Sequence, residues 1–188
     1  MSSQRREGEE RATPRAMPRK ERLAKLAGGL SVNDAARAYA RRTQGVLLEG
    51  EERAKADELD ATIEAMFLMA AVDGSVAAQE VAQLAAMMQA MLDTRDRQGP
   101  IELDATLIDL SRRLERDGWT ARLDDVARRL RTEESRSFAF RLAAAVAFVD
   151  DHVAHAEAAA IDALAAALNL SRDVSQQILS EVRDTLFG

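Results

Sequence analysis

Apolar residues recur every three to four positions along most of the chain from about Asp57 onward, which places them on one face of a helix. Turn signals, including Asp73-Gly74 and the segments TRDRQGP (94–100) and RDGW (116–119), divide this pattern into ordinary helix lengths. No stretch has the alternating pattern of a strand. The pattern predicts an all-α fold of seven helices, over residues 57–72, 78–92, 102–116, 120–131, 133–149, 154–168 and from 171 onward.

The helical pattern also predicts which side chains face the core and which one caps a helix. Leu59, Ile63 and Met66 are expected to face the core in the first helix, as are Leu123 and Val126 in the fourth. Ser171 is expected to cap the last helix, because serine at this position accepts a hydrogen bond from a free backbone N–H.

The segment before Asp57 has a different pattern. Residues 1–20 contain Pro14 and Pro18 and interleaved charges, with too few large apolar groups to offset the entropy of ordering. We therefore expect residues 1–30 to form a disordered, flexible basic arm. Residues 31–56 are expected to form an amphipathic helical linker that lies on its own domain, and residues 57–188 to form the helical domain.

Composition narrows the class of protein. Apolar residues make up 47% of the 188 residues, and the absence of cysteine excludes disulfides, thiolate zinc sites and a cysteine nucleophile. No apolar run approaches the roughly 20 residues that span a bilayer, and the N-terminus lacks the apolar centre of a signal peptide. We expect a cytoplasmic protein.

Charge is distributed unevenly along the chain. Residues 1–29 hold eight basic and four acidic side chains, which gives this segment a charge of +4. Because the net charge of the whole chain is −6, the remaining residues carry a charge of −10. A basic arm of this kind can rest on an anionic membrane surface or fold back on its own acidic body. Nucleic acid is not the expected partner.

A short acidic turn occurs twice. The segment VDGSVAAQE (72–80) returns as VDDHVAHAE (149–157) at a constant offset of 77 residues, and the flanking helical patterns match as well. This repeat predicts two pseudo-symmetric αα-hairpins that face each other.

The spacing of the repeat resembles the second half of a helix–loop–helix calcium site. The positions that would supply the earlier carboxylates are apolar, so neither turn is a complete loop. Since calcium takes about 6–8 oxygen ligands, the two turns would have to pool their acids or keep several waters. Alternatively, the glutamates only favour the starts of their helices. The candidate ligands are Asp73, Glu80, Asp150, Asp151 and Glu157.

The histidines offer a second possibility. His152 and His155 lie beside the second turn, and Asp151 and His155 at i, i+4 can hold zinc or another transition metal. Both histidines can equally be surface residues. The sequence has no serine nucleophile motif, phosphate-binding glycine loop or Glu-x-x-His pair, so we do not expect an enzyme.

The doubled turn, the segment IDALAAALNL (161–170) and the helical pattern resemble the TerB-like tellurite-resistance family over residues 57–188. The resemblance implies a seven-helix bundle that binds a divalent cation, calcium above all, at Asp73, Glu80, Asp150 and Glu157. It also implies protein partners in a stress-response complex near membranes. Asp151 departs from the family pattern, which has glycine there. The alternative is a helical protein-interaction scaffold without bound metal.

Overall fold

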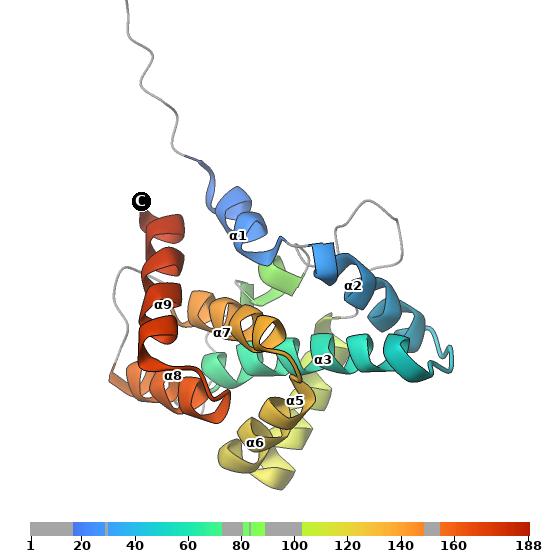
Figure 1. Cartoon of the computed structure of the whole chain (residues 1–188). Coiled ribbons are helices and arrows are strands. Elements are labelled where there is room, and N and C mark those ends of the chain that lie inside the picture. Colours follow the sequence, from blue (N-terminus) through green and yellow to red (C-terminus); the bar gives the residue numbers. More distant parts are fainter. Residues whose placement is uncertain (1–16, 29, 73–80, 83, 89–102, 149–154) are drawn as a thin grey trace, which may run out of the picture.

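The computed structural model describes residues 17–28, 30–72, 81–82, 84–88, 103–148 and 155–188. Over these residues the chain is all-helical and contains no strand, as predicted (Figure 1). Residues 81–82 and 84–88 are also helical. The helices with described bounds are α1 (Arg19–Ala27), α2 (Leu30–Thr43), α3 (Gly50–Ala70), α5 (Leu103–Asp117), α6 (Trp119–Arg129), α7 (Glu133–Ala147), α8 (His155–Ala167) and α9 (Arg172–Phe187).

Helix α3 forms the centre of the core. Every residue from Ala61 to Ala70 is buried, because other helices cover this half of α3 on all sides. Helix α7 packs along it and buries its own alanine-rich half, Leu142 to Ala147. The predicted core positions Leu59, Ile63 and Met66 are confirmed.

The predicted count of seven helices is wrong, because α1 and α2 belong to the packed fold as well. Helix α2 packs along α3 and buries Ala36, Ala38 and Tyr39, so this amphipathic segment lies on its own domain. Helix α3 begins at Gly50, seven residues before the predicted Asp57. Glu51 and Glu52 in its first turn complement the positive end of the helix dipole.

The predicted disordered arm must also be corrected. Residues 19–27 form α1, which contacts α7 and α9 and buries Leu23, Leu26 and Ala27. The apolar stripe at these positions gives the segment enough buried surface to dock. Residues 1–16 lie outside the described part of the chain.

Side chains cap α7 and α9. Thr132 and Ser135 form a reciprocal capping box at the start of α7, with Ser135 N donating to Thr132 Oγ1 at 3.0 Å. The predicted cap of α9 is confirmed, since Val174 N donates to Ser171 Oγ at 3.3 Å. These caps satisfy N–H groups that have no partner within the helix.

The two central helices end at corresponding positions of the sequence repeat. Helix α3 ends at Ala70 and α7 at Ala147, and their last turns lie toward the same side of the molecule (Figure 1). Each end closes with the same bond: Ala71 N donates to Phe67 O, and Phe148 N donates to Ala144 O, both at 3.0 Å. The residues that follow each helix, 73–80 and 149–154, lie outside the described part of the chain.

Candidate functional site

Most of the predicted ligands lie outside the described residues. These are Asp73, Glu80, Asp150, Asp151 and His152. His155 begins α8, but its side chain also lies outside the description. Glu157 is the predicted ligand that the structure describes.

Glu157 lies in the first turn of α8, where the helix dipole favours a negative charge. Its side chain is only partly exposed, and its Oε2 atom is buried. No hydrogen bond to this oxygen is present among the described residues. A buried carboxylate oxygen without a partner is unfavourable, so this atom fits a site that a cation or a proton completes.

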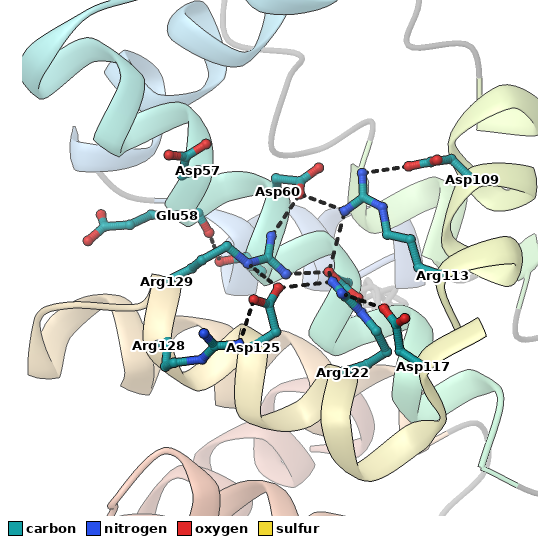
Figure 2. A network of polar contacts seen from close by, with 12 residues as sticks. Asp57, Glu58, Asp60, Asp109, Arg113, Asp117, Arg122, Asp125, Arg128 and Arg129 are labelled. Carbon is teal, nitrogen blue, oxygen red and sulfur yellow. Dashed lines mark hydrogen bonds and ion pairs between the residues drawn. The ribbon is translucent and has the colours of Figure 1, made fainter. Parts of the chain in front are cut away.

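A second group of charged side chains joins α3 to α5 and α6 (Figure 2). Asp57, Asp60 and Glu64 follow one another at spacings of three and four residues and so share one face of α3. Arg122 and Arg129 of α6 point toward this face (Figure 2).

Glu64 is the most deeply buried acid of this network, with 1% of its surface exposed. Arg122 donates two parallel hydrogen bonds to its carboxylate, from Nε to Oε1 at 2.7 Å and from Nη2 to Oε2 at 2.9 Å. Arg129 Nη2 also donates to Oε2, and Arg113 Nη1 lies 3.6 Å from it. Such two-pronged pairs between arginine and carboxylate are the stronger ion pairs in proteins.

Asp60 ties three helices to α3. Its Oδ2 atom accepts from Arg129 Nη1 at 2.7 Å and from Arg113 Nη1 at 3.1 Å, and Arg42 Nη2 lies 3.5 Å from Oδ1. The three arginines come from α6, α5 and α2. One carboxylate therefore fixes the positions of three neighbouring helices.

Trp119 sets the direction of α6 relative to α3. Its indole Nε1 donates to Leu68 O at 3.2 Å, while Arg122 meets Glu64 and Arg129 meets Asp60. Residue numbers therefore increase along α6 while they decrease along the facing part of α3, so the two helices run antiparallel.

The network shifts the titration of its members. Hydrogen bonds from Arg116, and then from Arg122, lower the pKa of Asp117 from its ordinary 3.8 to about 2. The pKa of Arg122 is raised, chiefly by its hydrogen bonds to Glu64. Burial raises the pKa of Tyr39, and the negative charge of Asp60 adds to the effect. Asp117 and Arg122 therefore stay charged over the whole neutral range.

This network is suited to holding helices together. The carboxylates of Asp60 and Glu64 already face guanidinium groups, so a metal cation entering there would meet positive charge. Within the described ranges, no three His, Cys, Asp or Glu side chains form a group that could hold a metal ion.

Sequence reasoning missed this network. The signal was the row of Asp57, Asp60 and Glu64 on a helix that is otherwise apolar toward its end, together with Arg122 and Arg129 at helical spacing. A buried acid in such a setting needs a basic partner, but the sequence does not say which one.

In comparisons with known proteins, no family model, no curated protein and no solved structure matches this chain. Among the described residues, no helix has the length and apolar character needed to cross a membrane.

Proposed function

We propose that this chain is a helical module that binds a divalent cation through the acidic turns after α3 and α7, without catalysis. Calcium is the first candidate, because the donors are carboxylates and hard cations prefer oxygen ligands. In this proposal the fold is TerB-like. The module would serve a stress-response assembly of the tellurite-resistance kind.

The observation that carries the proposal is the buried Oε2 of Glu157, for which the described residues supply no hydrogen-bond donor. A carboxylate oxygen is rarely left in this state, because its desolvation is compensated only by a partner. Glu157 is also the last residue of the repeated turn, at the position of the final glutamate in a calcium loop. A cation shared with the preceding acids would complete its environment.

The ends of α3 and α7 give further support. They stop 77 residues apart, which is the offset of the sequence repeat. Because the two helices pack together and end toward the same side, the segments that follow them start from one region of the molecule (Figure 1). This arrangement favours a single shared site for the acidic residues of the two turns over two separate groups.

A melting experiment tests the proposal. The full chain, stripped of metal, is melted with and without calcium, and in parallel with magnesium, manganese or zinc. At about one hundred times the dissociation constant, a bound ion adds about 2.7 kcal/mol to the free energy of unfolding. For a chain of this size, that corresponds to a rise of about 5–10 °C in Tm.

Glu157→Gln should remove most of this rise, because the amide keeps the shape but loses the charge. Glu133→Gln is the matched control, since Glu133 is an exposed acid in the first turn of α7. It should keep the full rise. If no ion shifts the wild-type Tm, the cation proposal fails and the helical interaction scaffold takes its place.

A further inference from the structure

Helix α1 is a short element at the edge of the packed fold. It contacts α7 and α9 near the C-terminal end of α9 (Figure 1). One side of α1 buries Leu23, Leu26 and Ala27, while Ala24 and Lys25 on the other side are exposed. The surface formed by α7 and α9 therefore already receives an amphipathic helix.

Arg22 fixes how α1 is seated. Its Nη1 atom donates to Leu186 O at 2.7 Å, and its Nε atom donates to Met17 O at 2.8 Å. Leu186 lies in the last turn of α9, where backbone carbonyls lack partners within the helix. The positive charge of Arg22 also complements the negative end of the helix dipole. The surface that binds α1 therefore recognises the positive charge of Arg22 as well as the buried leucines.

Helix α1 has few features that would stabilise it on its own. The helix has only nine residues, and Pro18 at its N-cap provides no side-chain cap. Gly28 ends it in an extended conformation. A helix this short is not stable alone in water, so α1 is helical because it is docked. Such elements open at a lower free energy than the core does.

We propose that the α7–α9 surface is a helix-binding site, and that α1 is its built-in, displaceable ligand. The external partner is an amphipathic helix of the same chemistry, with an arginine directly before the first of two leucines spaced three apart, and a small residue after the second. When such a helix binds, α1 leaves the surface. The proposal does not depend on cation binding.

The test uses the full chain and a fluorescent peptide that copies residues 17–28. Leu23→Asp/Leu26→Asp places charges on the buried side of α1 and should vacate the surface. Ala24→Asp is the control, because it places a negative charge on the exposed side of the same helix. The vacated variant should bind the peptide about tenfold or more tightly than the wild type and the control do, because in those two α1 still occupies the surface.

Equal binding to all three proteins, or no binding to a vacated variant that keeps its helical circular dichroism, would overturn the proposal. A peptide with the same two leucine substitutions should not bind. A wild-type dimer that disappears in the vacated variant would also overturn it, since the occupant would then be a second copy. If the vacated variant does not fold, hydrogen exchange on the wild type decides. Amides of α1 must then exchange much faster than those of α7 and α9, and exchange at one common rate would contradict the proposal.

Discussion

Arg122 on α6 holds both carboxylate oxygens of Glu64 on α3, at 2.7 Å from Nε to Oε1 and at 2.9 Å from Nη2 to Oε2. Glu64 lies within a run of buried apolar residues, so it has little access to water. The pair therefore does two things. It satisfies a buried charge, and it fixes the register of α6 against α3.

Arg122→Met should destabilise the fold strongly. It leaves the buried Glu64 without its two-pronged partner, and removing one member of a buried ion pair typically costs about 3–5 kcal/mol. Because Arg129 still donates to Glu64, the loss should lie at the lower end of this range. The free energy of unfolding from urea titrations checks this prediction. Arg128→Met is the control on the same helix, because Arg128 is largely exposed and its pair with Asp125 should contribute less than about 1 kcal/mol. Similar losses in both variants would contradict the role given to Glu64.

Acid should weaken the protein partly through Asp117. Its pKa in the folded state is lowered from 3.8 to about 2, because Arg116 and Arg122 stabilise the charged form. Its ion pairs therefore stabilise the folded state fully at pH values above the ordinary pKa of 3.8, and this contribution is lost as the pH falls through about 2. Asp117→Asn should lower stability near neutral pH and flatten its decline over this acidic range. Parallel pH profiles for the two proteins would show that Asp117 is not responsible.

Thr132→Ala should weaken the start of α7. It removes the hydroxyl that accepts from Ser135 N, and loss of an N-cap typically costs about 1 kcal/mol. For a chain of this size, Tm should fall by about 2–4 °C. Thr132→Ser keeps the hydroxyl and should leave Tm nearly unchanged. An equal fall in both variants would mean that the cap is not what stabilises this helix.

Two neighbouring leucines between α2 and α3 should respond differently. Leu47 is 86% exposed, whereas Leu48 is 5% exposed and packs with Ala38 and Ala56. Leu48→Ala should cost about 2–5 kcal/mol, as is usual for a truncated core leucine. Leu47→Ala should change the free energy of unfolding by less than about 0.5 kcal/mol. A larger loss for Leu47→Ala than for Leu48→Ala would show that Leu47, and not Leu48, packs in the core.

The helical periodicity of the sequence predicted the fold class and much of the core, since Leu59, Leu123 and Val126 are buried as expected. It placed the start of α3 too late, because residues 50–56 are mostly polar and only Ala56 among them is buried. Glutamate, arginine, alanine and lysine nevertheless favour helices strongly enough to extend α3 back to Gly50. The prolines and charges before Leu23 and Leu26 favour a disordered arm, yet these two leucines share one face of α1 and are buried.

The ion-pair network was harder to predict for a physical reason. Glu64 and Arg122 are 58 residues apart in the chain, and helical spacing shows only which side chains share a face of one helix. The pairing depends on how α6 crosses α3, which is set by the packing of the whole core. The acidic turns, by contrast, were visible as a repeat because their two copies keep one offset in the sequence.

Calcium titration of the metal-stripped full chain by calorimetry tests most directly whether the two acidic turns share one ion. If they do, the wild type binds a single calcium ion per chain, and either Asp73→Asn or Asp150→Asn abolishes binding while helical circular dichroism is retained. Two ions per chain, with each variant losing one of them, would contradict a shared site. The absence of any calcium binding would contradict a calcium site altogether.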